Sequence, residues 1–297
     1  MSKLAIDSKF VGVPWKEDIR EITWRQTTNY AASLNDMNPL YFDEEQEGGL
    51  YASPMFPVTL CWRIILADRA KYAPAGLPYP QEVWDTLMHY TEYIDIKRPL
   101  KPDVKVRIKS QISAMIPQRA GTQIVNRFDV EDFEDGKPYY TEYVGSMLRG
   151  VECADGGKGS LPEYQKTKYV GNALWESPAF CSQALPYIYD GCGDLVFAIH
   201  TSPKFARSVG LKTNVLHGTA NLAIGVKEVI NRELGGDARR VKTIAGKFTS
   251  MVFPNDNLRV QLFDRKVSND AVELYWQLLN ESTGKVAVTY GYVKASV

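Results

Sequence analysis

The feature that most constrains the fold is an internal repeat: the two halves of the 297-residue chain match in order, offset by about 150 residues. In each half a loop leads into an apolar stretch, over 52–70 in the first and 212–230 in the second. Apolar residues recur there at helical spacing, as at Leu222, Val226 and Val229. The chain is therefore predicted to fold as two similar units, each built around one helix.

After each predicted helix the sequence alternates between apolar and polar residues, which is typical of half-buried strands. The alternating segments are 89–115 and 122–148 in the first half, and 240–267 and 272–297 in the second. Turn sequences interrupt them at matching places, PLKPD and EDGK in the first half and FPNDN and ESTGK in the second. Each half is predicted to be a helix followed by a meander of long antiparallel strands, which is a duplicated α+β fold.

The composition sets the domain organisation and the class of partner. Residues 151–170 concentrate Gly, Pro and charge, so we expect this linker to join an N-terminal repeat, 1–150, to a C-terminal repeat, 171–297. Lys plus Arg equals Asp plus Glu at 35 each, so no overall field attracts nucleic acid or an anionic membrane. The four cysteines lack metal-ligand spacing, and no window approaches the roughly 18 apolar residues of a membrane span. A cytoplasmic protein is expected.

The candidate chemistry lies between Gly193 and Thr219, where two of the three histidines occur. Gly193-Asp194 is followed by His200, then by the run FARSVGL over 205–211, and then by LHGT over 216–219. These motifs resemble, in residue type and order, those of the MaoC-like dehydratases and the R-specific 2-enoyl-CoA hydratases. The repeat and the linker extend the resemblance over nearly the whole chain, to members with two fused hot-dog units.

The resemblance implies a double hot-dog fold and a hydro-lyase that adds water to a trans-2-enoyl-CoA or removes it from a 3-hydroxyacyl-CoA. Asp194 would act as the base, and His200 would orient the water and carry the proton. The Gly218 N–H, at the start of the second helix, would hold the thioester oxygen as it becomes enolate-like. Coenzyme A enters as part of the substrate, and neither a further cofactor nor a metal is implied.

The sequence departs from the family pattern at two places. The family spaces its Asp and His five residues apart around Asn-Pro, whereas Asp194 and His200 are six apart around LVFAI. The more apolar segment predicts a bulky or non-standard acyl group. In the first half, Tyr41 stands where the histidine is expected and Pro57 where His217 stands in the second, so that half is predicted to be degenerate and to widen the substrate tunnel. The expected substrate-binding residues are His217, Thr219, Tyr189, Phe197, Arg239 and Arg240, the two arginines for the phosphates of coenzyme A.

Several alternatives stay open. Asp190 is a competing carboxylate that reads as a turn residue, Cys192 could form a Cys–His nucleophilic pair with His200, and His89 is expected to pack or cap near a strand. The function could instead be that of a hot-dog thioesterase or of a non-catalytic acyl-CoA-binding subunit. Because fused repeats satisfy one sheet pairing internally, the chain could be a monomer or a homodimer.

Overall fold

The structure is a computed structural model, and it describes residues 4–66, 69–74, 81–84, 86–164, 166 and 171–297. Residues 67 and 68 of the first predicted helix, and residues 165 and 167–170 of the predicted linker, lie outside the described residues. No helix in the described ranges combines the length and the apolar character that a membrane crossing requires.

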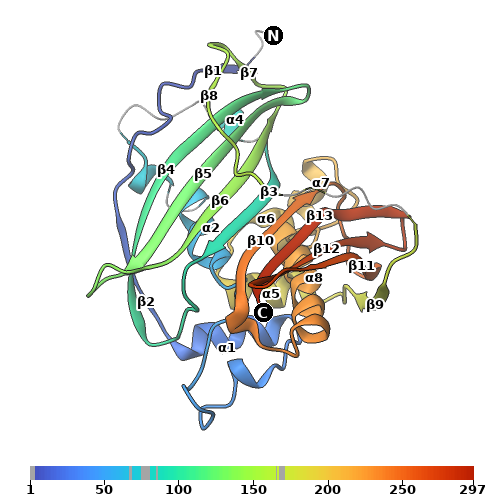
Figure 1. Cartoon of the computed structure of the whole chain (residues 1–297). Helices are drawn as coiled ribbons and strands as arrows, with labels where there is room; N and C mark the ends of the chain where they lie inside the picture. Colours follow the sequence, from blue (N-terminus) through green and yellow to red (C-terminus); the bar gives the residue numbers. More distant parts are fainter. Residues whose placement is uncertain (1–3, 67–68, 75–80, 85, 165, 167–170) are drawn as a thin grey trace.

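In the part of the chain that the structure describes, the two repeats share one strand order, and together they form a single 11-stranded sheet (Figure 1). The first repeat has the order β2-β4-β5-β6-β3, and the second mirrors it as β9-β11-β12-β13-β10. The antiparallel pairing of β3 with β10 joins the two halves. The strands of the first repeat are β2 (Asp18–Ile22), β3 (Leu87–Ile96), β4 (Val104–Gln118), β5 (Gly121–Asp132) and β6 (Pro138–Arg149). Those of the second are β9 (Trp175–Phe180), β10 (Val241–Phe248), β11 (Asn257–Val267), β12 (Ala271–Asn280) and β13 (Lys285–Ser296).

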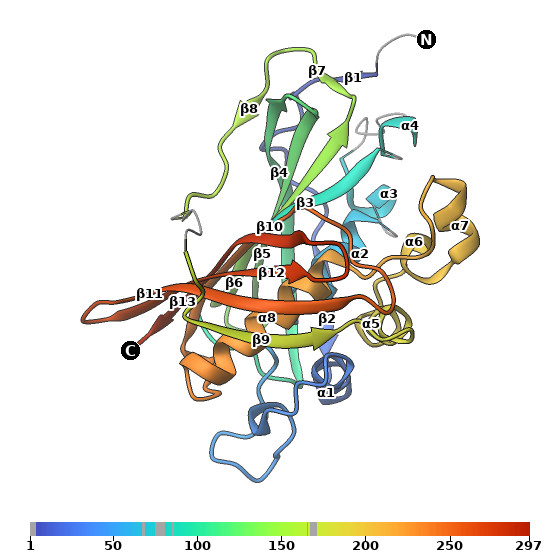
Figure 2. The same ribbon diagram turned by 90° about the vertical axis from the view of Figure 1, so that its right-hand side faces the viewer.

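A helix lies against the sheet in each repeat: α2 (Val58–Ile65) in the first and α8 (Gly218–Glu233) in the second. Figure 2 shows α8 enclosed by the strands of the second repeat. The close approach depends on small residues, because a Cβ added to Gly225 would lie only 2.0 Å from Cζ3 of the fully buried Trp276. A Cβ at Gly291 would likewise lie 2.5 Å from Cδ2 of the same indole. This arrangement confirms the predicted α+β double hot-dog architecture.

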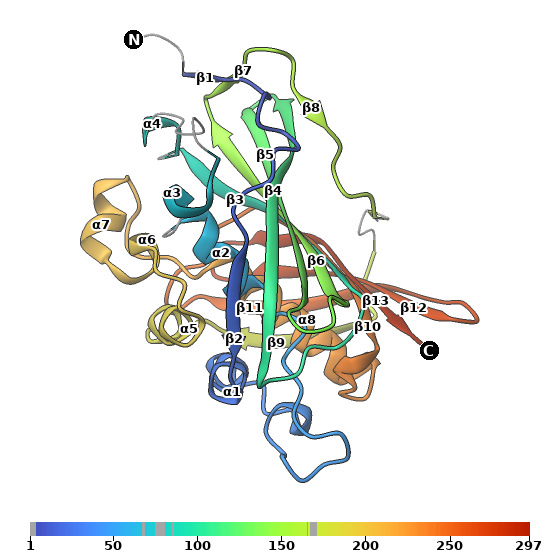
Figure 3. The ribbon, with the colours of Figure 1, turned by 90° about the vertical axis from the view of Figure 1, so that its left-hand side faces the viewer.

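The segment that precedes each central helix contains a further helix that the sequence did not predict. In the first repeat, a capping box formed by Thr23 and Gln26 starts α1 (Trp24–Ser33), and in the second, α5 (Leu185–Gly193) begins with Pro186 in its first turn. These two helices pack against each other, as Figure 3 shows. The remaining helices are α3 (Arg69–Tyr72), α4 (Gln81–Trp84), α6 (Ala198–Thr201), α7 (Pro203–Ser208) and the 3-10 turns η1 (Pro39–Tyr41) and η2 (Ala238–Arg240).

The predicted linker contains short strands in its described part. β7 (Glu152–Cys153) pairs with β1 (Ala5–Ile6), and β8 (Lys158–Gly159) pairs with β4. A Cβ at Gly159 would lie 2.2 Å from the carbonyl oxygen of Ser113, so this glycine allows the linker to approach the sheet. The linker therefore adds pairing to the first repeat.

Candidate active site

A mainly apolar cavity of about 360 Å³ lies at the N-terminus of α8, where the second repeat meets strand β3 of the first. Its walls come from α2, β3, the segment around α6, the start of α8 and the end of β10. All three histidines of the chain, His89, His200 and His217, line it. A concave apolar site with a few convergent polar groups is the usual form of a small-molecule site.

His200 stands on the short helix α6 in a fixed orientation. Its Nδ1 lies 2.9 Å from the carbonyl oxygen of Val215, so Nδ1 carries the hydrogen and Nε2 is left as an acceptor for a molecule in the cavity. Its ring stacks on His217 with 3.6 Å between centroids. Burial, together with the neighbouring His217 and His89, holds the pKa of His200 well below its ordinary value. The imidazole is thus neutral at pH 7, which is the form that can accept a proton.

His217 is the residue before the first turn of α8, and it lies between the cavity and a half-buried carboxylate. Its Nε2 lies 3.4 Å from Oδ2 of Asp190 on α5. Burial lowers the pKa of His217, and the Asp190 carboxylate opposes that shift. Asp190, which was predicted to be a turn residue, is therefore a helical residue whose carboxylate lies next to His217.

The first turn of α8 has backbone N–H groups available for a ligand. The first N–H groups of any helix have no acceptor within the helix, and here no side chain caps them. Gly218 is the first residue of the helix, and a Cβ there would come within 3.3 Å of Nδ1 of His89 and 3.4 Å of the Phe248 ring. Gly218, the expected oxyanion donor, therefore lies where an oxyanion in the cavity could reach its N–H.

Two of the expected substrate-binding residues have different positions. Phe197 lines the cavity, with its ring edge-to-face against His200 at 5.9 Å. Tyr189 is fully buried and does not line the cavity; its ring lies 5.1 Å from that of His217, and its hydroxyl donates to Oγ1 of Thr219 at 3.0 Å and meets the hydroxyl of Tyr30 at 3.1 Å. Tyr30 and Tyr189 are the matching residues of the two repeats. The pair supports Thr219, which itself lines the cavity.

Asp194 does not meet His200 in the cavity. It ends α5 with a left-handed backbone, φ 51°, and its Oδ2 accepts from Arg63 at 2.7 Å. Its side chain is 66% exposed and is not among the residues that line the cavity, whereas the next residue, Leu195, lines it. Leu195 is also the residue five positions before His200. The family's spacing therefore falls on a leucine, and the predicted Asp194–His200 pair is not formed.

The structure also places Arg239 and Arg240 away from this cavity. They follow the C-terminus of α8, whose 16 residues span about 24 Å from Gly218. Arg239 pairs with Asp237 at 2.8 Å, and Nε of Arg240 donates to the carbonyl oxygen of Ser296 at 2.9 Å. A phosphate of a substrate at the N-terminus of α8 would need other partners.

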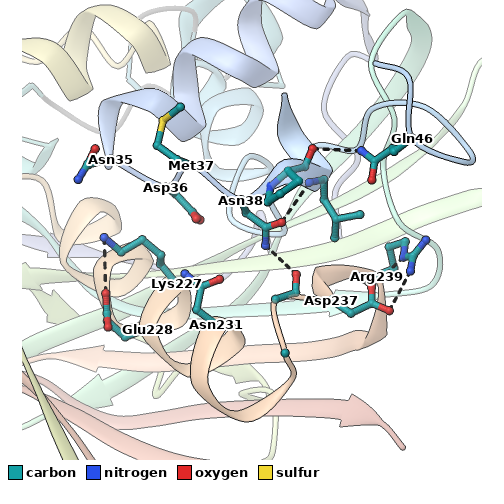
Figure 4. A pocket seen from close by; sticks show the side chains of 14 residues that line it. Asn35, Asp36, Met37, Asn38, Gln46, Lys227, Glu228, Asn231, Asp237 and Arg239 are labelled. Atoms are coloured by element: carbon teal, nitrogen blue, oxygen red, sulfur yellow. Dashed lines mark hydrogen bonds and ion pairs between the residues drawn. The ribbon is translucent and has the colours of Figure 1, made fainter. Parts of the chain in front are cut away.

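Arg239 instead borders a polar pocket of about 810 Å³, shown in Figure 4, between the first-repeat segment Asn35–Leu40 and the C-terminal part of α8. Asn38 joins the two sides, because its Nδ2 donates to the carbonyl oxygen of Gly236 at 2.6 Å. Asp36 is 6% exposed there, and burial raises its pKa to about 6. The Asp-Met-Asn-Pro motif that the first repeat retains therefore forms a contact between the repeats.

The counterpart of the histidine cavity in the first repeat is almost filled. The space around the loop that leads into α2, lined by Ser53, Pro57 and Tyr140, has a volume of only about 20 Å³. Tyr41, which stands where the second repeat has His200, is 1% exposed, and its burial raises the pKa of its hydroxyl. Aromatic rings and a proline thus occupy the volume that the second repeat leaves open.

His89 is the site residue that sequence reasoning missed. It lies between the rings of Trp62 and Phe248, with centroid separations of 4.6 and 4.2 Å. Its Nε2 lies 3.2 Å from the carbonyl oxygen of Thr91 and 3.1 Å from Oε2 of Glu92. Burial lowers the pKa of His89 to about 3. Its strand was predicted, but no sequence signal shows that this strand forms the wall of the other repeat's cavity.

Comparison with known proteins agrees with this geometry. The family described as MaoC like domain matches residues 182–274, and the FAS1-like dehydratase domain region matches residues 9–135. A MaoC-like dehydratase from Phytophthora capsici has the same fold, with a TM-score of 0.84, 22% identity and coverage of 97% of this chain and 96% of that one. A Mycobacterium tuberculosis protein described as having a double hotdog fold superposes with a TM-score of 0.60, 10% identity and 95% and 96% coverage. The chain therefore has a double hot-dog fold, and residues 182–274 within it match the MaoC like domain.

The curated relatives of this chain carry more specific names. Peroxisomal enoyl-CoA hydratase 2 of Arabidopsis thaliana is 27% identical over 205 residues, which are 63% of this chain and 64% of that protein. The chain spans about half to two thirds of the length of the first curated relatives it matches. Among the MaoC-like proteins, this chain is similar to those named enoyl-CoA hydratase 2.

Proposed function

We propose that this chain is a hydro-lyase that adds water to a trans-2-enoyl-CoA or removes it from a 3-hydroxyacyl-CoA. One observation carries the proposal: a neutral, oriented histidine, His200, and the uncapped N-terminus of α8 line the same mainly apolar cavity. The apolar walls suit an acyl chain, and the two polar features suit the two needs of the reaction. The similarity to hydratase 2 proteins supports the same assignment.

In the hydration direction, Nε2 of His200 accepts a proton from water while the water oxygen bonds to the β-carbon. The π electrons of the double bond move to the thioester oxygen, which becomes an enolate held by the Gly218 N–H. The imidazolium of His200 then returns its proton to the α-carbon, and the carbonyl reforms. General acid–base help of this kind contributes roughly 10²–10⁴-fold, and one oxyanion donor roughly 10²–10³-fold.

We also propose that the product is the R-hydroxy thioester and that the acyl group is bulky or non-standard. Phe197 and Leu195 support the second point, because they place apolar surface where a more polar turn was expected from the family pattern. The cytoplasmic location stays a prediction.

The test is an assay of purified chain with a panel of trans-2-enoyl-CoA thioesters, following loss of the conjugated enoyl absorbance and the chirality of the product. His200→Ala should lower kcat at least 100-fold while its melting temperature and its affinity for a saturated acyl-CoA stay close to those of the wild type. Full turnover by His200→Ala would refute the assignment. Release of free CoA, detected with a thiol reagent, would indicate a thioesterase, and tight acyl-CoA binding without turnover would indicate a binding subunit.

A further inference from the structure

The proposed reaction needs one group besides His200 and the Gly218 N–H. A single histidine can remove a proton from water, but the attacking oxygen must also be held over the β-carbon, and a misplacement of about 1 Å can cost 10²-fold in rate. In the family pattern a carboxylate five residues before the histidine is available for this, and here that position is Leu195. Among the described residues that line the cavity, none is an Asp or a Glu.

The first repeat supplies a polar group at the right place. His89 comes from β3, and its Nδ1 lies next to Gly218, 3.3 Å from where a Cβ would stand. Its other nitrogen, Nε2, faces the carbonyl oxygen of Thr91, which can only accept, so Nε2 carries the hydrogen. Nδ1 is then an acceptor directed at the cavity, on the same helix N-terminus that His200 borders.

A local irregularity of β3 builds this arrangement. On a regular strand, residues three apart point to opposite faces of the sheet. The pairing of β3 with β6 shifts register between His89 and Thr91, so the side chains of His89 and Glu92 meet on one face at 3.1 Å. Bulges of this kind often re-aim a side chain beside an active site.

Glu92 lies next to Nε2 of His89, with its Oε2 3.1 Å away. Its side chain is 0% exposed, and burial raises its pKa well above the ordinary value. It interacts there with a second fully buried carboxyl, that of Glu142, whose Oε2 in turn accepts from Sγ of Cys61 at 3.1 Å. Burying two carboxyl groups without a cation costs stability. The aromatic packing of His89 does not need them, and Oε2 of Glu92 lies close enough to Nε2 of His89, 3.1 Å, to favour one orientation of its ring.

We infer that His89 is a second catalytic residue, contributed by the otherwise degenerate first repeat, and that Glu92 is its positioning residue. In this inference, which rests on the proposed function, the reacting water donates one hydrogen to Nδ1 of His89 and gives the other as a proton to Nε2 of His200. The proton stays on His200 until it is returned to the α-carbon, and His89 remains neutral throughout. In the reverse direction, the same Nδ1 accepts a hydrogen bond from the 3-hydroxyl of the substrate.

The first experiment compares kinetics of four variants in the full chain. His89→Phe keeps an aromatic ring between Trp62 and Phe248 but removes the acceptor, and it should lower kcat about 100-fold with KM changed less than about threefold. Glu92→Leu should lower kcat about tenfold, and Glu92→Gln, which keeps a polar side chain of the same shape beside Nε2 of His89, should restore most of it. The matched control is Glu142→Leu, which removes an equally buried carboxyl that contacts Glu92 and Cys61, and it should keep kcat within about threefold.

The second experiment measures ligand binding rather than turnover. Calorimetry would compare two unreactive CoA thioethers that differ only in a 3-hydroxyl. The wild type should bind the hydroxylated thioether about fivefold more tightly, the value of one ordinary hydrogen bond, and His89→Phe should lose that preference. An unchanged preference, or full kcat in His89→Phe while His200→Ala is inactive, would overturn the inference and leave the proposed function intact. A wild type that hydrates no enoyl-CoA would overturn both.

Discussion

The sharpest prediction concerns Asp194, because the family pattern and the structure assign it opposite importance. If Asp194 were the catalytic base, Asp194→Asn would lower kcat by roughly 10²–10⁴-fold. In the structure its carboxylate lies on the surface, where it pairs with Arg63 at 2.7 Å and both side chains are about half exposed or more, 47% and 66%. We therefore expect Asp194→Asn to keep kcat within about threefold.

The stability change can be worked from the same contact. An exposed ion pair contributes about 0.2–1 kcal/mol, and Asn tolerates the left-handed backbone that Asp194 adopts, so no strain is added. For a chain of this size, about 1 kcal/mol shifts Tm by roughly 2 °C. The loss of stability should disappear in high salt, because screening already removes the attraction in the wild type.

The assay measures kcat and KM for an enoyl-CoA substrate, together with thermal unfolding at low and high salt. Arg63→Gln serves as the matched control, since it breaks the same pair from the other side and should give the same small effects. If turnover by Asp194→Asn fell at least 100-fold while Arg63→Gln stayed fully active, the carboxylate would have to enter the cavity during the reaction. That result would refute our reasoning about Leu195.

Three further predictions test the fold and the electrostatics. Gly225→Ala should destabilise the chain by about 1–3 kcal/mol or more, because its Cβ would lie 2.0 Å from Trp276, whereas Gly191→Ala, with open space around its Cβ, should be neutral or stabilising in chemical denaturation. Burial raises the pKa of Asp36 from 3.8 to about 6, so its contribution to stability is complete below pH 3.8 and is lost as pH rises through 6. Asp36→Asn should therefore gain up to about 3 kcal/mol over the wild type between pH 4 and pH 7, measured by urea unfolding at each pH, and an equal difference at both would contradict this. Arg239→Gln should leave KM for acyl-CoA unchanged, and a tenfold rise would place the coenzyme at the C-terminus of α8.

The sequence was sufficient to predict the duplicated strands and the central helices, because alternation and helical spacing are properties of local composition. The strands from 87 to 149 and from 241 to 296 fall on the predicted segments. Helices α1 and α5 were missed because their interiors are polar or glycine-rich, and a capping box or an early proline specifies them more than periodicity does.

The site was harder to predict, and each difference has a physical cause. The left-handed backbone conformation of Asp194, at the end of α5, decides whether residue 194 or residue 195 faces the cavity. The spacing of residues in the sequence does not reveal this conformation. Arg239 and Arg240 were predicted to bind the phosphates of coenzyme A, but they follow the C-terminus of α8, whereas the cavity lies at its N-terminus. His89 required the bulge in β3 and the pairing of the repeats, and both are tertiary properties.

The pairing of β3 with β10 makes each repeat depend on the other for the wall of the cavity. The first repeat has closed its own cavity, yet its strand β3 carries His89 while β10 carries Phe248, so the seam between the repeats is itself part of the open cavity. Expressed alone, either half would present a bare strand edge and an incomplete wall. The first repeat, which has closed its own cavity, is therefore as necessary as the second. Neither repeat can be lost without removing part of the wall of the remaining cavity.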